Sequence, residues 1–116
     1  MSWNLIIGRN MKVYWSDFAS ETLRDIYVYY KGAAGKTIAD KIKLSIFSAT
    51  RQLGKYPNSG KVEDNLKILD EDHRYLLKGN YKIIYKTVKE GLLITDVFDT
   101  RQDPEKITLT SRKTRR

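Results

Sequence analysis

Residues 73–101 decide the fold, and they read HRYLLKGNYKIIYKTVKEGLLITDVFDTR. Three short runs rich in Ile, Val, Leu and Tyr are separated by two tripeptides, which begin at Lys78 and Lys89 and contain Gly or Asn. Gly and Asn tolerate the positive φ of tight turns, so the stretch predicts two consecutive hairpins in an antiparallel meander. Cations occur on every predicted strand: Arg74, Lys78, Lys82, Lys86 and Arg101. The pattern indicates a sheet surface suited to an anionic partner.

The segment before the meander predicts one strand and a helical hairpin. Residues 12–15 form a short run typical of a strand, and Ser16 and Asp17 are both good helix N-caps. Apolar residues then recur at three- and four-residue steps along residues 17–31 and again along 36–53. The short link between the two helices predicts that they run antiparallel. We interpret both apolar stripes as core and not as a cofactor site.

The expected element order is β–α–α–β–β–β, which predicts an α+β fold with the helical hairpin on one face of a twisted antiparallel sheet. We expect the opposite sheet face to stay partly open and to form a concave basic surface. Residues 62–72 have no firm period and contain five acidic residues. Their spacing matches no metal-binding loop, so we expect a solvated loop there, with an irregular strand at residues 66–69 as an option.

At 116 residues the chain is expected to form a single domain, which we place at residues 11–107. Residues 1–10 fit an extra edge strand, a flexible extension or an artefact of the start site, and these alternatives stay open. Residues 108–116 are a basic tail that we expect to be disordered.

The net charge of +8 is unevenly distributed. Residues 1–72 hold 11 Lys and Arg against 9 Asp and Glu, whereas residues 73–116 hold 11 against 5. An excess of positive charge on the sheet and tail favours nucleic acid or an acidic protein as partner. Solubility alone is the simpler explanation of this charge.

Several classes of protein are excluded by composition. The chain has no Cys and one His, His73, which excludes disulfides, thiolate metal sites and multi-His metal sites. No apolar run approaches the ~20 residues of a membrane span, and no export signal is evident. We therefore expect a cytoplasmic protein with no cofactor, no metal and no membrane partner.

The candidate functional residues are four cations and one tyrosine of the meander: Arg101, Lys82, Arg74, Tyr81 and Lys78. Cations bind phosphates and aromatic rings stack on bases, so this mixture suits single-stranded RNA. A cation cluster can also stabilise the transition state of phosphodiester cleavage without a metal.

Each candidate residue also has a structural interpretation. Arg74 could pair across strands with Asp96 or Asp99, and Lys78 could be a solvated turn residue. Tyr81 could belong to the core, and Arg101 could form a structural ion pair. We regard Arg101 as the most suggestive because it stands where the last strand ends.

Four groups of residues resemble the RelE/ParE superfamily of type II toxin–antitoxin toxins. They are Ser16 with Leu23-x-x-Ile26-x-x-Tyr29-Tyr30, Pro57-x-x-Gly60, Gly79-Asn-Tyr-Lys-Ile-Ile-Tyr85, and Val97-Phe-Asp-Thr-Arg101-Gln-Asp-Pro104. The resemblance covers about residues 11–107. It implies helices packed on a twisted antiparallel sheet, as the pattern of elements also predicts.

The resemblance implies one of two activities. One branch of the superfamily consists of metal-independent, ribosome-dependent mRNA endoribonucleases, and the other inhibits DNA gyrase. In this chain Lys82 falls on the family's central-strand Arg/Lys position, Arg101 on the basic position that ends the last strand, and Arg74 near another. The C-terminal Tyr or His of the nucleases would fall near Ile107, and no Tyr or His follows Tyr85.

The ParE-like branch is therefore the leading hypothesis. It implies a growth-inhibiting toxin of a plasmid-stabilisation module that acts on DNA gyrase by binding. A cognate antitoxin with an acidic or amphipathic segment would neutralise it. One alternative is a RelE-like endoribonuclease that acts on the ribosome with mRNA, so enzymatic activity is left open. A further alternative is a non-toxic nucleic-acid-binding module.

Overall fold

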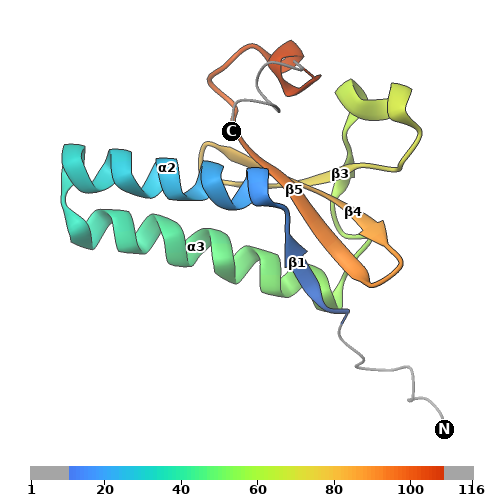
Figure 1. The fold of residues 1–116 in the computed structure, drawn as a ribbon, viewed down its shortest axis with the longest axis horizontal. Coiled ribbons are helices and arrows are strands. Elements are labelled where there is room, and N and C mark those ends of the chain that lie inside the picture. Colours follow the sequence, from blue (N-terminus) through green and yellow to red (C-terminus); the bar gives the residue numbers. More distant parts are fainter. Residues whose placement is uncertain (1–10, 109–116) are drawn as a thin grey trace, which may run out of the picture.

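The structure, a computed structural model that describes residues 11–108, has a layer of two helices against a five-stranded sheet (Figure 1). The helices are α2 (Asp17–Ala34) and α3 (Lys36–Lys55). The strands are β1 (Val13–Trp15), β2 (Lys61–Val62), β3 (Arg74–Lys78), β4 (Tyr81–Val88) and β5 (Gly91–Asp99), and two 3₁₀ helices span Asp64–Leu69 and Pro104–Thr108. The expected α+β class is confirmed. The predictions for residues 1–10 and for the end of the tail lie outside the described residues.

The sheet has the strand order β1-β5-β4-β3-β2 and is mixed. The meander is confirmed, because β3 pairs antiparallel with β4 and β4 pairs antiparallel with β5. The expectation of a wholly antiparallel sheet is wrong, because β1 runs parallel to β5, with Val13 opposite Leu92 and Trp15 opposite Ile94. The helical hairpin carries the chain away from the sheet and back to it. The strands that follow can therefore run parallel or antiparallel to β1. Local sequence does not encode which strand β1 joins.

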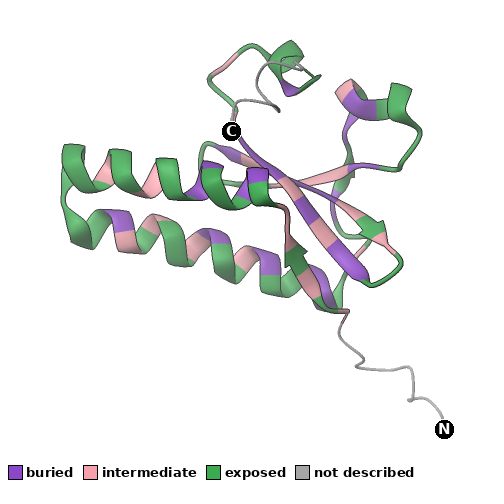
Figure 2. Ribbon diagram, viewed as in Figure 1, coloured by how far each residue is buried: buried purple, intermediate pink, exposed green. Residues whose placement is uncertain are grey.

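The helical hairpin extends well beyond the sheet (Figure 1). The Ser16 side chain caps α2 by accepting a hydrogen bond from the Ala19 N–H at 3.0 Å. Helix α2 continues beyond residue 31, the last residue of the predicted helical stripe, and stops at Gly35, whose φ of 94° suits glycine. Figure 2 shows purple, buried positions mainly where the helices cross the sheet and exposed ones along the projecting half. The projecting half therefore contributes little to the core.

The sheet carries a hydrophobic core on each face. On the helix side, Leu23, Ile46 and Leu53 pack against inward residues of β4 and β5. On the opposite face, a second cluster contains Leu66, Ile84, Phe98 and Ile107, with Tyr75 packed beside it. Leu66 and Ile107 come from the two 3₁₀ helices.

The expectation of an irregular strand at residues 66–69 is wrong, because these residues belong to a 3₁₀ helix. The second sheet face, which we expected to stay partly open, is covered in part by this second cluster. Apolar residues of β4 point to both faces, and the register shifts between Ile84 and Tyr85, so neither face can remain fully solvated. The segment after residue 63 forms a 3₁₀ helix because the Glu63 carboxylate accepts the Asn65 N–H at 3.0 Å and caps its start. Neither α2 nor α3 is apolar enough over its length to cross a membrane.

Candidate functional site

The structure divides the five candidate residues between two faces of the sheet. Tyr81 and Arg101 lie together on the helix side, at the end of the sheet that α2 passes. Lys78 pairs with Tyr81 in the β3–β4 register and is exposed beside it. Lys82 contacts Tyr75 and Glu63 on the opposite face, and Arg74 lies at the other end of β3. The predicted single basic surface is therefore wrong.

Asp99 holds the Arg101 side chain. The carboxylate accepts Nε–H at 2.9 Å and Nη2–H at 2.8 Å, and it also accepts the Arg101 backbone N–H at 2.9 Å. Bidentate charge-assisted bonds of this kind fix both the position and the plane of a guanidinium. The Arg101 side chain is nevertheless 57% exposed, so it can still reach a ligand. The structural ion pair considered for Arg101 exists and leaves the residue accessible.

Tyr81 and Tyr30 complete this cluster, and their pKa values shift in opposite directions. Burial, followed by the hydrogen bond with Tyr30, raises the pKa of Tyr81, which is only 7% exposed. Hydrogen bonds with Tyr81 and then with Arg101 lower the pKa of Tyr30. We call Arg101, Asp99, Tyr81 and Tyr30 the Arg101 cluster.

Sequence reasoning did not identify Tyr30 or Asp99 as site residues. Tyr30 continues the apolar stripe of α2 and therefore reads as a core position. Asp99 was considered only as a cross-strand partner of Arg74. The i,i+2 spacing of Asp99 and Arg101 at the end of the last strand is the sequence signal that could have indicated their ion pair.

A cleft of about 750 Å³ opens beside the cluster, between α2 and the end of β5. We call it the Arg101 cleft. Its lining residues are Thr22, Asp25, Ile26, Tyr29, Tyr81, Val97, Asp99, Arg101, Gln102 and Lys106. Tyr29 is 65% exposed, so the mouth of the cleft presents an aromatic ring and a guanidinium together. Tyr and Arg are among the residue types most enriched at energetically important positions of protein interfaces.

The Lys82 side chain is held by contacts within the fold. Its Nζ lies 2.8 Å from Oε1 of Glu63 and 4.3 Å from the centre of the Tyr75 ring. Burial acts to raise the pKa of Glu63, but hydrogen bonds from Lys82 and Asn65 outweigh it and the pKa is lowered. Lys82 therefore ties the start of the 3₁₀ helix to β4.

The Arg74 side chain is also held by contacts within the fold. Its Nη1 donates to the Gly60 carbonyl at 3.1 Å, and its Nε lies 3.4 Å from Oδ2 of Asp72. The suggested pairing with Asp96 or Asp99 is wrong, because the strand register places these residues opposite Ile84 and Tyr81 instead.

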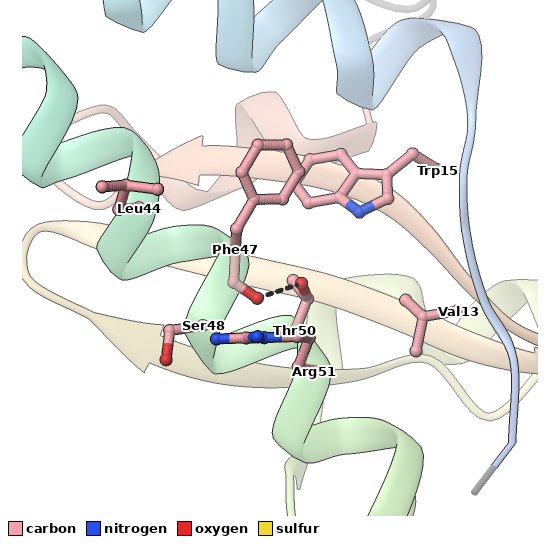
Figure 3. A pocket seen from close by; sticks show the side chains of 7 residues that line it. All are labelled: Val13, Trp15, Leu44, Phe47, Ser48, Thr50 and Arg51. Atoms are coloured by element: carbon pink, nitrogen blue, oxygen red, sulfur yellow. Dashed lines mark hydrogen bonds between the residues drawn. The ribbon is translucent and has the colours of Figure 1, made fainter.

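A second surface lies between β1 and α3 (Figure 3). This β1–α3 groove has a volume of about 640 Å³ and is lined by Val13, Trp15, Leu44, Phe47, Ser48, Thr50 and Arg51. The Trp15 and Phe47 rings meet edge to face at 5.4 Å, with Leu44 and Val13 beyond them. Leu44 is 65% exposed. Large apolar side chains gathered in a concave surface are typical of a docking site.

Among residues 11–108, no strand pairs with the outer edge of β1 at this groove. In the parallel ladder, the Lys12 carbonyl and the Ser16 N–H bond to β5, so Val13 and Trp15 direct their own N–H and C=O groups the other way. No other strand of the five-stranded sheet lies on that side. Within residues 11–108 no group of His, Asp or Glu side chains is placed to hold a metal ion.

Comparisons with known proteins give a consistent answer. A family model described as the ParE toxin of the type II toxin–antitoxin system parDE matches residues 13–104. A solved structure, the chromosomal ParDE toxin–antitoxin system from P. aeruginosa, is similar with a TM-score of 0.65 and 19% identity. That likeness covers 79% of this chain and 98% of the other, and it shows a shared fold. No curated protein sequence matches the chain.

Proposed function

Because the chain belongs to the ParE toxin family of type II toxin–antitoxin systems, we propose that it inhibits growth in the cytoplasm by binding DNA gyrase. Membership of this family implies a cognate antitoxin as partner. The proposal has two finer parts. One assigns target binding to the Arg101 cleft, and the other assigns antitoxin binding to the β1–α3 groove.

The observation that carries binding over cleavage is the pairing of the cations. Arg101, Lys82 and Arg74 each lie within 4 Å of a carboxylate, at 2.8, 2.8 and 3.4 Å. Metal-free phosphodiester cleavage needs cations free to stabilise negative charge that develops in the transition state. Cations already matched by Asp or Glu supply less of that stabilisation. Protein binding has no such requirement.

The Arg101 cleft supports a protein as the target. Arg101 stays exposed although it is paired, and Tyr29 stands beside it at the mouth of the cleft. An oriented Arg next to an exposed Tyr supplies a planar hydrogen-bonding group and a rigid apolar surface. Both are properties of anchor residues in protein interfaces.

A ribosome-dependent endoribonuclease is the second candidate, and the placement of Arg101 and Tyr81 in the lining of one cleft favours it. A Tyr with a raised pKa can donate a proton to a leaving group, and the exposed guanidinium can approach a phosphate. Tyr81 is almost completely buried, however, which limits its access to an RNA backbone.

Two assays on the purified chain distinguish these candidates. We expect inhibition of supercoiling by DNA gyrase and intact mRNA in a translating extract. Arg101→Ala should abolish the inhibition, whereas Lys89→Ala, at the exposed turn between β4 and β5, should leave it unchanged. Unaffected gyrase at high excess of the chain would refute the proposal, and cleaved mRNA would establish the nuclease. Harmless expression with strongly salt-dependent binding to free nucleic acid would indicate the non-toxic module.

The β1–α3 groove fits an acidic amphipathic segment of the antitoxin. Its apolar floor offers Leu44 and Phe47, which are exposed in the structure. Two cations lie at the groove. Arg51 lines it, and Lys43 Nζ lies 5.9 Å from the centre of the Phe47 ring. Burial of apolar side chains would supply affinity, and opposite charge would speed the encounter.

A further inference from the structure

We propose that residues 3–7, which read WNLII, add as an antiparallel strand to the outer edge of β1 and cover the β1–α3 groove until the antitoxin displaces them. The displacement rests on the proposed function, which places the antitoxin in the same groove. The added strand does not depend on it. Residues 1–10 lie outside the described residues, whereas the edge and the groove that they would meet are both described.

The outer edge of β1 offers main-chain groups to a further strand. The Lys12 carbonyl and the Ser16 N–H bond to β5 on the inner side. Val13 and Trp15 alternate with them, so their own N–H and C=O groups point outward. Such an edge is a template for another extended segment.

The spacing along the chain sets the register of this segment. Residues 8–10 contain Gly and Asn, and a three-residue loop with such residues is a common hairpin connection. That loop places Leu5 opposite Val13 and Trp3 opposite Trp15. Val13 and Trp15 are the two β1 residues whose main-chain groups point outward, so the loop length and the edge agree.

The new ladder would be short. The Met11 N–H already donates to the Gly54 carbonyl at 2.9 Å, so pairing begins at Val13 and ends at Trp15. Strand β2 shows that a ladder of two residues is sufficient in this sheet, since Lys61–Val62 pairs with β3. Side chains must then supply much of the stabilisation.

The side chains of the segment match the groove. Successive side chains of a strand alternate between faces, so Trp3, Leu5 and Ile7 share one face. Opposite residues of paired strands also share a face, and the β1 residues concerned pack against the helix-side core. On that side Leu44 is 65% and Phe47 37% exposed (Figure 3). The added strand would remove both groups of apolar side chains from water.

Tethering and charge explain why the segment can both bind and leave. A short linker gives a tethered segment an effective concentration of about a millimolar, so weak contacts can hold it in place. Residues 1–10 contain no Asp or Glu. They therefore offer no carboxylate to Arg51 and Lys43 at the groove, whereas an acidic antitoxin segment would.

The test is amide hydrogen exchange of the full-length chain, followed by NMR. The Val13 and Trp15 N–H groups should exchange at least about tenfold more slowly in the unmodified chain than in Leu5→Pro, because proline removes the N–H that pairs with Val13. The Ser16 N–H, bonded to β5, is an internal reference that should not change. Asn4→Pro is the matched control, since the N–H of residue 4 would point away from β1 and protection should remain.

Two exchange results would overturn the inference. Equal rates at Val13 and Trp15 in the unmodified chain and in Leu5→Pro would exclude the strand. Equal acceleration in Asn4→Pro and Leu5→Pro would exclude the register. Both substitutions lie outside residues 11–108, and thermal unfolding of each variant verifies that the domain is folded.

Titration calorimetry with the purified cognate antitoxin measures the displacement. Leu5→Pro should bind about tenfold more tightly than the unmodified chain, as expected when the groove is open in about one tenth of the free molecules. Asn4→Pro should bind like the unmodified chain. Slow exchange at Val13 and Trp15 together with equal affinities would overturn the displacement and refute the proposed antitoxin site, while the added strand would stand. Unprotected N–H groups would refute the strand and leave the proposed function untouched.

Discussion

Glu63 and Lys82 form the most deeply placed ion pair among the described residues. The Glu63 side chain is 1% exposed and that of Lys82 is 19% exposed. Glu63 also accepts two hydrogen bonds from Asn65, through its backbone N–H and its side-chain amide. A carboxylate so well satisfied is stable when buried, but only while its cation remains.

Lys82→Ala should destabilise the fold by about 3 kcal/mol, because it leaves the Glu63 carboxylate buried without a cation. Urea denaturation measures this loss in the free energy of unfolding. Lys86→Ala is the matched control on the same strand, since Lys86 pairs with a half-exposed Glu71 at 2.9 Å. Its cost should stay below about 1 kcal/mol, as for other surface pairs. Similar losses for both variants would contradict a structural role specific to Lys82.

The same pair makes stability depend on pH. The folded-state pKa of Glu63 is lowered from 4.5, despite the opposing effect of burial, by hydrogen bonds from Lys82 and Asn65. The contribution is therefore fully present above the unfolded pKa and is lost as pH falls through the folded pKa. Urea denaturation between pH 7 and pH 3 should show a decline that begins near pH 5.

Glu63→Gln should flatten part of this decline. Some dependence on pH should remain, because the pKa of Asp99 is also lowered, first by its hydrogen bond with Arg101. A profile for Glu63→Gln that parallels that of the unmodified chain would show that Glu63 does not contribute.

At the level of elements, Tyr85 connects β4 to the turn that follows α3. Its hydroxyl donates to the Pro57 carbonyl at 2.8 Å and accepts the Gly60 N–H at 3.0 Å. A Cβ at position 60 would lie 2.5 Å from the Tyr85 hydroxyl oxygen and 2.7 Å from the Tyr75 carbonyl oxygen. Only glycine allows the turn to approach the sheet this closely.

Gly60→Ala should therefore destabilise the fold by about 2 kcal/mol, as expected for overpacking against backbone and a buried ring. Gly32→Ala is the control with the same chemical change. A Cβ at position 32 meets nothing within 4 Å, and alanine in the interior of α2 should add about 0.5–1 kcal/mol of stability. Thermal unfolding should shift downward for the first variant and upward for the second. An upward shift for both would refute the packing argument.

At the level of the whole molecule, the two proposed binding surfaces lie on different sides of α2. Thr22, Ile26 and Tyr29 line the Arg101 cleft. Leu23 and Tyr27 line an extension of the β1–α3 groove that also contains Trp15 and Phe47. A short antitoxin segment in the groove would leave the cleft uncovered. Direct neutralisation would then require a longer segment that reaches around the helical hairpin.

Separate surfaces predict separable functions. Leu44→Glu should weaken antitoxin binding at least tenfold while the chain stays toxic, because it places a charge in the apolar floor of the groove. Arg101→Ala should remove toxicity and retain antitoxin binding. Titration calorimetry with the cognate antitoxin and growth on induction measure the two properties. Loss of both properties in either folded variant would show that the surfaces are not independent.

The sequence by itself determined the local elements and the family. Turn residues at Gly79 and Gly91 define the meander, and Ser16 begins the first helix, because these signals act over a few neighbouring residues. The fold class and the resemblance to toxins follow from the same residues. The sequence also identified Arg101 as a candidate, since it stands just after the last strand.

Tertiary structure decided which of these residues meet. It set β1 parallel beside β5, covered part of the second sheet face with 3₁₀ helices, and paired Lys82 with Glu63. It also placed Tyr29, from a helix far away in the chain, in the same cleft as Arg101. The physical reason is that the role of a Lys or Arg side chain depends on the sheet face to which it points and on the carboxylate with which it pairs on that face. Both are fixed by long-range packing and strand register, which local patterns do not encode.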